Sequence, residues 1–198
     1  KKQNMSLKNL NVTTKIPKVL NNNLKNKIID RIYKRFEKRL NISENFIVAV
    51  SGGPDSLALA FLAKIYSIKN RIKSNYFIID HKLRPESTKE AKIVKNILKK
   101  YLINSEILTW KGKKPHKNIQ SLARKKRYEL LFGQCDKLKT NNILLGHHRD
   151  DLFENFFIRI LRGSGLKGLI SFDKKRTFVN KNLLRPLLSQ KKEDLLFL

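Results

Sequence analysis

The sequence predicts an α/β fold, a doubly wound and mostly parallel sheet with helices on both faces. Short apolar runs rich in β-branched residues, such as FIVAV at 46–50, alternate with longer segments whose apolar residues recur with helical period. The runs have the continuous apolar character of strands that are buried on both faces. Regular alternation of strand and helix indicates a parallel sheet, because each parallel connection needs a crossover, usually a helix.

The predicted elements follow one another in a regular order. A leading amphipathic helix is expected over 24–40, where the apolar residues share one helical face. Strands are predicted over 46–50, 75–80, 103–110 and 141–146, and helices over 56–67, 87–101, 118–132 and 150–162. The remaining predicted segments are a basic loop, a glycine-rich stretch and a return into the sheet, over 111–117, 163–169 and 183–188.

The amino-acid composition and the length limit which partners and which domain organisation are plausible. The 198 residues carry a net charge of +28 and a pI near 10.4, so the surface attracts polyanions, with RNA or DNA as the natural class. No apolar run approaches the length of a membrane span, and the single cysteine, Cys135, excludes an intrachain disulfide or a cysteine cluster within these residues. Residues 1–23 are expected to be a disordered basic segment. Residues 24–198 are expected to form one catalytic domain that is truncated at its C-terminal end, because SQKKEDLLFL stops within an apparent amphipathic helix.

A bare turn, SGGPDS, joins the first predicted strand to its helix. Gly52 and Gly53 lack Cβ atoms, so the backbone can bend tightly there and a ligand can approach it closely. The N–H groups that begin the following helix favour an anion such as phosphate, and Asp55 would repel that phosphate unless a cation lay between them. The alternative is a tight turn with a serine or Asp55 as helix cap. The predicted phosphate-binding residues are Ser51, Gly52, Gly53, Pro54, Asp55 and Ser56.

Chemically capable side chains also follow the second strand. DHKLRPES offers Asp80, His81 and Arg84, whose planar guanidinium suits a phosphate, although a solvated arginine in a strand-end turn is the alternative. The carboxyl ends of parallel strands meet at one edge of a sheet, so these residues are expected to converge with the SGGPDS turn. In the predicted helix 118–132, Arg124 and Arg127 share a face with an aromatic neighbour. That face is either solvated or holds a phosphate or a base.

The stretch GHHRDDLFEN after the fourth strand gathers three acids at a predicted helix start. Asp150, Asp151 and Glu154 can share one face, with His147 and His148 in the preceding turn. Helix capping explains one or two of these acids, but Glu154 lies within an otherwise apolar helix. Since the chain has only 16 acidic residues, three within five positions indicate a bound cation, either Mg²⁺ or a substrate ammonium. For the histidines we expect acid–base or hydrogen-bonding roles rather than zinc ligation.

Several stretches together resemble known families. The SGGPDS turn has all five defining positions of the SGGxDS loop of the PP-loop ATP pyrophosphatases, which cleave ATP between its α- and β-phosphates. A longer, collinear set over 46–192 resembles the N-terminal catalytic domain of the bacterial tRNA(Ile)-lysidine synthetases: SGGPDSLAL, DHKLRPES, QSLARKKRY, HHRDDLFEN, RILRGSGLKGL and LLRPLLS. This resemblance implies a Rossmann-like PP-loop ATPase fold of the adenine nucleotide alpha hydrolase-like type.

The resemblance implies an ATP-dependent tRNA-modifying ligase. ATP would adenylate the C2 oxygen of the wobble cytidine in a tRNA(Ile) with a CAU anticodon and release pyrophosphate. Free L-lysine would then displace AMP and form lysidine. A bacterial cytoplasmic location without membrane attachment is implied, with an organelle of bacterial descent as the less favoured alternative, and we keep a homodimer as a prediction. Two other functions stay open, a thiolation-type PP-loop tRNA enzyme and a nonenzymatic basic RNA-binding module.

The same resemblance implies roles for individual residues. The implied cofactors are ATP and Mg²⁺, with Asp55 as the metal ligand. The implied catalytic residues are Asp55, Asp80, His81, Arg84, His147, Asp151 and Glu154. The residues implied to contact lysine or tRNA are Arg124, Arg127, Asp150 and Arg162.

Overall fold

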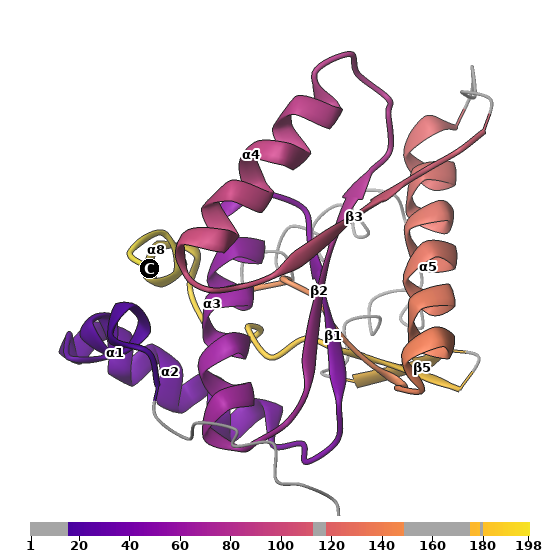
Figure 1. Ribbon diagram of the computed structural model, residues 1–198. Helices are drawn as coiled ribbons and strands as arrows, with labels where there is room; N and C mark the ends of the chain where they lie inside the picture. The colour runs from indigo at the N-terminus through magenta and orange to yellow at the C-terminus, as the bar shows by residue number, and fades with distance from the viewer. Residues whose placement is uncertain (1–15, 113–117, 149–174, 179) are drawn as a thin grey trace, which may run out of the picture.

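A single six-stranded sheet, with the strand order β3-β2-β1-β4-β6-β5, organises the part of the chain that the structure describes (Figure 1). The structure is a computed structural model that describes residues 16–112, 118–148, 175–178 and 180–198. The strands are β1 (Phe46–Val50), β2 (Ser74–Asp80), β3 (Ser105–Thr109), β4 (Asn142–Leu144), β5 (Lys175–Phe178) and β6 (Lys181–Leu184). All neighbouring strands pair in parallel except β5, which is antiparallel to β6. The predicted mostly parallel sheet is therefore confirmed.

Helices cover both faces of the sheet. They are α1 (Lys18–Leu24), α2 (Lys27–Leu40), α3 (Pro54–Lys69), α4 (Ser87–Lys100), α5 (Ile119–Leu138) and α8 (Lys192–Leu196). Helices α3 and α4 lie on one side of the strands and α5 lies on the other (Figure 1). Successive side chains of β1 alternate between two buried clusters, because strand side chains point to opposite faces. Phe46 and Val48 pack with α2 and α3, whereas Ile47 packs with Leu131 and Cys135 of α5. This arrangement confirms the doubly wound prediction.

The N-terminal part of the chain differs from the sequence prediction. Residues 1–23 were expected to be disordered, but helix α1 begins at Lys18, and its Leu20 is fully buried in the same cluster as Phe36 of α2. A seven-residue helix is too short to be stable alone, so burial against the rest of the domain must hold it. The part of the predicted segment before residue 16 lies outside the described residues.

Several element boundaries also differ from those predicted. Helix α5 continues to Leu138 rather than ending at 132, and α3 begins at Pro54, a residue that is well tolerated in the first helical turn. The return segment is strand β6, which forms a hairpin with the unpredicted strand β5. The expected helix over 150–162 and the glycine-rich stretch over 163–169 lie outside the described residues. In the described part, no helix is both long and apolar enough to cross a membrane.

Candidate active site

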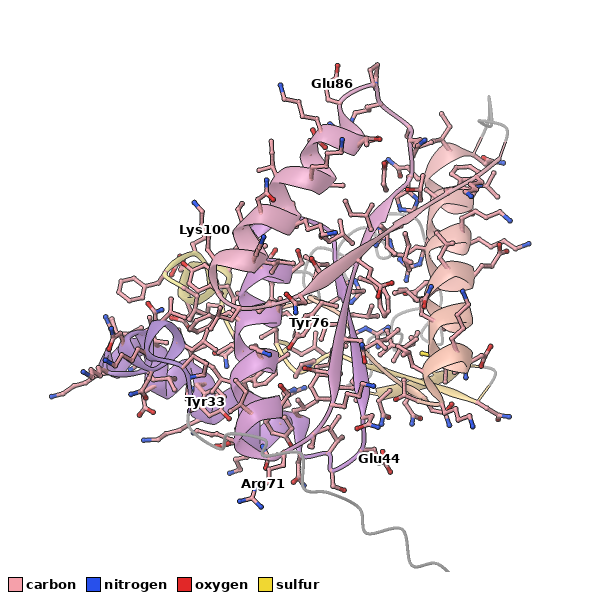
Figure 2. All side chains as sticks on the ribbon, viewed as in Figure 1. Tyr33, Glu44, Arg71, Tyr76, Glu86 and Lys100 are labelled. Atoms are coloured by element: carbon pink, nitrogen blue, oxygen red, sulfur yellow. The ribbon has the colours of Figure 1, made fainter. Side chains whose placement is uncertain are left out.

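The residues that follow β1, β2, β4 and β6 line one edge of the sheet. Glu44, just before β1, and Glu86, just before α4, lie at opposite ends of the molecule, and the strands run from the first end toward the second (Figure 2). Two adjoining cavities lie near the carboxyl ends of the strands and share Ser51, Ile79 and His81 as lining residues. The prediction that strand-end residues converge is thus confirmed for the described part of the chain.

The two cavities differ in chemistry. The larger one, about 410 Å³ and here called the apolar cavity, is lined mainly by aliphatic side chains of β2, α4 and the loop between them: Ile78, Ile79, Leu83, Ala91, Ile93, Val94 and Ile97. The smaller one, about 250 Å³ and here called the polar cavity, is lined by ionisable or polar side chains: Ser51, Asp55, Ser56, His81, Arg124, Arg127, Tyr128 and His147. An apolar compartment beside a cationic one suits a ligand that joins a flat apolar ring to an anion.

The SGGPDS turn is fixed by hydrogen bonds to the hydroxyl group of Ser56. The Ser56 hydroxyl accepts hydrogen bonds from the amides of Ser51 at 3.2 Å and Gly52 at 3.0 Å, and donates one to the Gly53 carbonyl at 2.8 Å. Ser56 is only 4% exposed. Its observed contacts therefore shape the loop from beneath, whereas Ser51 is exposed and lines both cavities.

Two glycines of this turn, and a third glycine that packs against it, differ in the space around them. Gly52 has φ +93°, a conformation that favours glycine, and a Cβ atom there would lie 2.7 Å from the Val94 side chain. Gly53, the N-cap of α3, has an ordinary φ of −72°, and a Cβ atom there would meet nothing within 4 Å. Gly146, which sequence reasoning did not single out, packs so closely that a Cβ atom would lie 3.1 Å from the Ser56 backbone. Gly52 and Gly146 thus shape the site, while Gly53 leaves space beside the start of α3.

Asp55 sits in the first turn of α3, and its two oxygens differ. Its Oδ2 lies 3.4 Å from Nε2 of the buried His148, whereas its Oδ1 is buried and has no hydrogen-bond partner within the described part of the chain. A buried carboxylate oxygen that no donor satisfies is costly, so it calls for an explanation such as a cation. Mg²⁺ prefers one or two carboxylates together with phosphate oxygens, and the unpartnered Asp55 oxygen fits that preference.

Asp80 has the opposite character, since both of its oxygens are used by the protein. Its Oδ1 accepts from the Lys82 amide at 2.9 Å and the Ser87 hydroxyl at 2.8 Å, and its Oδ2 accepts from the Thr88 hydroxyl at 2.6 Å. Burial tends to raise the pKa of this carboxyl group, but the bonds from Thr88, Lys82 and Ser87 together outweigh burial and lower it. Asp80 was expected to be catalytic, yet its observed contacts tie the loop after β2 to the start of α4.

We predict that Asp80→Asn destabilises the protein. The new amide group is uncharged, so all three bonds lose the charge that strengthens them, and the free energy of unfolding should fall by about 2 kcal/mol or more. Because folding lowers the Asp80 pKa, the stabilisation is complete above the unfolded value of about 4 and is lost as the pH falls through the folded value. Urea denaturation at pH 7 and at pH 3 measures both effects. A variant as stable as the wild type at pH 7 would contradict this role.

His81 lies where the two cavities meet. Both Nδ1 and Nε2 are buried, and neither makes a hydrogen bond with the residues that the structure describes. Burial lowers the His81 pKa, the nearby Arg127 guanidinium lowers it further, and Asp80 partly offsets both effects. A neutral imidazole offers one donor and one acceptor, and here both are available to a ligand that spans the cavities.

The predicted arginines divide between the two cavities. Arg84 lines the apolar cavity and forms an exposed ion pair with Glu90 at 2.9 Å, which is of the kind that contributes little stability. Arg124 and Arg127 both line the polar cavity, and the Arg124 guanidinium lies 5.7 Å from the centre of the Tyr128 ring. The structure thus brings Arg124 and Arg127 together with Asp55, whereas Arg84 faces the neighbouring cavity.

The last group of predicted residues is only partly described. His147 lines the polar cavity, and its Nδ1 accepts a hydrogen bond from Nε of Arg185 at 3.3 Å. Sequence reasoning missed Arg185 and gave no separate role to His148. Arg185 directly follows β6 and His148 lies in the loop after β4, so their position after parallel strands could have found them. The other predicted residues, Asp150, Asp151, Glu154 and Arg162, lie outside the described residues.

The fold and the site define a class of protein. A parallel α/β sheet with a strand–SGG–helix turn at its carboxyl edge is a nucleotide-binding domain of the PP-loop type. A family model described as "PP-loop domain" matches residues 21–197, and the chain belongs to this PP-loop domain family.

Curated proteins with related sequences share one name. The chain is 45% identical over 149 residues to the tRNA(Ile)-lysidine synthase of Orientia tsutsugamushi, an alignment that covers 75% of this chain and 33% of the relative. It is 42% identical over 144 residues to that of Wolbachia sp. subsp. Brugia malayi, with 72% and 33% covered. For Rickettsia bellii the identity is 35% over 170 residues, with 83% and 39% covered. The chain thus spans about a third of the length of these relatives.

Solved structures with the same fold are more distant in sequence. The U34-tRNA thiolase NcsA from Methanococcus maripaludis, solved with its 4Fe–4S cluster, has a TM-score of 0.71 at 20% identity and matches 86% of this chain and 61% of its own. The NMN synthetase from Francisella tularensis has a TM-score of 0.53 at 11% identity, with 85% and 66% covered. At these identities the likeness shows the fold alone.

Proposed function

We propose that the chain is the catalytic domain of a tRNA-modifying ligase that adenylates the wobble cytidine of a CAU-anticodon tRNA(Ile) and joins lysine to it. The observation that carries the proposal is the pairing of an open phosphate loop at Gly53 with an unpartnered Asp55 oxygen in a cavity lined by Arg124 and Arg127. The three relatives that share the tRNA(Ile)-lysidine synthase name support the choice of reaction.

We place ATP across the two cavities. The aliphatic side chains of the apolar cavity suit the adenine ring, and the start of α3, where Gly53 leaves open space, suits the leaving pyrophosphate. His81 lies at the junction, where it can donate to one ligand oxygen and accept from a hydroxyl group. Asp55 would hold Mg²⁺, which when bound neutralises charge on the phosphates.

The polar cavity is the proposed place of both bond-forming steps. The C2 oxygen of the cytidine attacks the α-phosphate of ATP and pyrophosphate leaves; the lysine ε-amine then attacks C2, and AMP leaves with the oxygen. Arg124 and Arg127 lie where negative charge builds up on the phosphates, so they can stabilise it. An unstacked anticodon base can enter such a site without melting a helix.

Pyrophosphate exchange tests the proposed function most directly. Labelled pyrophosphate should enter ATP only when the chain is supplied with a tRNA bearing a CAU anticodon, because the adenylated group is on the tRNA. A tRNA with a GAU anticodon is the matched control and should give no exchange. Exchange that ignores the tRNA, or that needs lysine instead, would overturn the assignment of the acceptor.

Two other functions make different predictions. A thiolation-type enzyme of this fold remains the nearest rival, but the single cysteine is buried and burial raises the pKa of its thiol to about 11, which disfavours a reactive thiolate. A nonenzymatic RNA-binding module would account for the charge, but not for an unpartnered carboxylate beside a phosphate loop. We also propose a bacterial cytoplasmic location. We further propose a homodimer, and light scattering would test this by measuring the molar mass.

We predict that the acids after β4 separate lysine transfer from RNA binding. Asp151→Asn and Glu154→Gln each remove a charge that repels RNA, so tRNA affinity should stay the same or rise. If these acids bind the lysine ammonium, lysine incorporation should fall by roughly tenfold or more, the scale of one charge-assisted contact. Tritiated lysine incorporation at several lysine concentrations measures this, and higher lysine should partly restore the weaker variant. Restoration by Mg²⁺ instead would assign the acids to the metal.

We predict that tRNA binding weakens steeply with salt. The net charge of +28 implies many contacts to phosphate, and a protein making about 6 to 10 such contacts loses about 10³ to 10⁵ in affinity between 50 and 200 mM salt. Filter binding over that range should give a straight line on logarithmic axes. A flat line would mean that the positive charge has no part in RNA binding.

A further inference from the structure

The residues after β4 and β6 meet because these strands are neighbours. Leu144 of β4 pairs with Leu184 of β6 in a parallel register, and the Leu145 amide donates to the Leu184 carbonyl at 2.9 Å. Both strands therefore end at the same edge of the sheet. His147 lies in the segment that follows β4, and Arg185 is the first residue after β6.

The hydrogen bond between these two residues has only one chemical direction. The Arg185 side chain is buried, with the residue 3% exposed, and its Nε–H donates to Nδ1 of His147 at 3.3 Å. A guanidinium has no acceptor and stays protonated, so His147 Nδ1 must accept and must carry no hydrogen. In a neutral imidazole the single ring hydrogen then sits on Nε2.

We propose that Arg185 is a positioning residue that fixes His147 as the Nε2–H tautomer, so that His147 acts as a hydrogen-bond donor at that nitrogen rather than as a proton acceptor. His147 lines the polar cavity, which Arg124 and Arg127 already make suitable for an anion. A hydrogen-bond donor on His147 would make the cavity more favourable for an anion. The tautomer follows from the structure alone, whereas the catalytic consequence rests on the proposed function.

Stability alone does not distinguish a positioning role for Arg185 from a purely structural one. Replacing a whole buried ion pair with apolar side chains is often neutral or stabilising, whereas removing one buried partner is destabilising in either case. Arg39 offers a matched control, because it lines a third cavity together with Arg185, and its Nε has no hydrogen-bond partner among the described residues. Arg185→Met and Arg39→Met thus remove the same group from two sides of one cavity, and only the first loses a bond to His147.

Nitrogen NMR of the histidine rings tests the tautomer directly. The chain has four histidines, and a His147→Gln variant identifies the His147 signals. In the wild type and Arg39→Met, Nδ1 should be unprotonated and Nε2 protonated at pH 8. In Arg185→Met a population with hydrogen on Nδ1 should appear. If Arg185→Met does not fold, Arg185→Lys keeps the charge but moves the donor, and it should show the same change to a smaller extent.

Kinetic measurements then distinguish the effect of Arg185 on the His147 tautomer from its effect on the proposed reaction. In pyrophosphate exchange, Arg185→Met should lower kcat by roughly tenfold with the KM for ATP within about twofold, and Arg185→Lys should fall between it and the wild type. An unchanged His147 tautomer in both Arg185 variants would overturn the inference. A changed tautomer in a chain whose wild type shows no exchange would uphold the positioning role and reject the proposed function.

Discussion

Gly53→Val should abolish ATP binding while the domain stays folded. A Cβ atom at Gly53 would touch nothing within 4 Å, and its φ of −72° is open to any residue, so the fold accepts a side chain there. That side chain would fill the space in which a phosphate meets the first amides of α3. Losing two charge-assisted bonds costs about 3 kcal/mol, so ATP affinity should fall about a hundredfold or more.

The controls for this variant distinguish steric exclusion of the phosphate from unfolding of the domain. Valine is a poorer N-cap than glycine by about 1 kcal/mol, which should lower the melting temperature by only about 2 to 4 °C in a domain of this size. Gly133 of α5 also has open space at its Cβ position and lies outside both cavities, so Gly133→Val should bind ATP normally. Calorimetric titration with ATP measures all three proteins. Wild-type affinity in Gly53→Val would sink the phosphate-loop assignment.

Asp55→Asn should remove activity without removing stability. The Oδ1 atom of Asp55 makes no hydrogen bond to the described residues, and an amide can keep the contact of Oδ2 with Nε2 of His148, so the free energy of unfolding should change by less than about 1 kcal/mol, the scale of one charge in the first turn of a helix. Pyrophosphate exchange should fall by about a hundredfold, the scale of losing two to three kcal/mol of charge stabilisation on the phosphates. The Mg²⁺ concentration needed for half-maximal exchange should rise.

The comparison with Asp80→Asn makes this prediction sharper. Both variants change a buried or half-buried carboxylate after a strand into an amide, but Asp80 is held by three donors and Asp55 has a free oxygen. Asp80→Asn should therefore lose stability, and Asp55→Asn should keep it and lose exchange. If the two variants behaved alike in both measurements, the distinction between a positioning and a metal-binding carboxylate would be wrong.

Much of the fold could be predicted because its signals are local. The apolar run FIVAV and the helical period after it depend on neighbours in the chain, and so do the steric properties of the glycines in SGGPDS. The rule that ligands bind at the carboxyl ends of parallel strands predicted that Ser51, His81 and His147 converge on one site, and in the structure all three line one or both of two adjoining cavities. Helix α1 escaped prediction because its stability comes from burial of Leu20 and not from its own sequence.

The sequence by itself determined the alternation of the first four strands with their helices, the glycine turn after β1 and the set of chemically capable residues. Only the tertiary structure decided what those residues do. Asp55 and Asp80 look alike in the sequence, and their roles diverge because one meets three donors and the other keeps an unpartnered oxygen. Arg185 gains its meaning from His147, 38 residues away, through the pairing of β4 with β6. A hydrogen bond depends on where two atoms lie to within a few tenths of an ångström, and no local pattern in a chain specifies that distance.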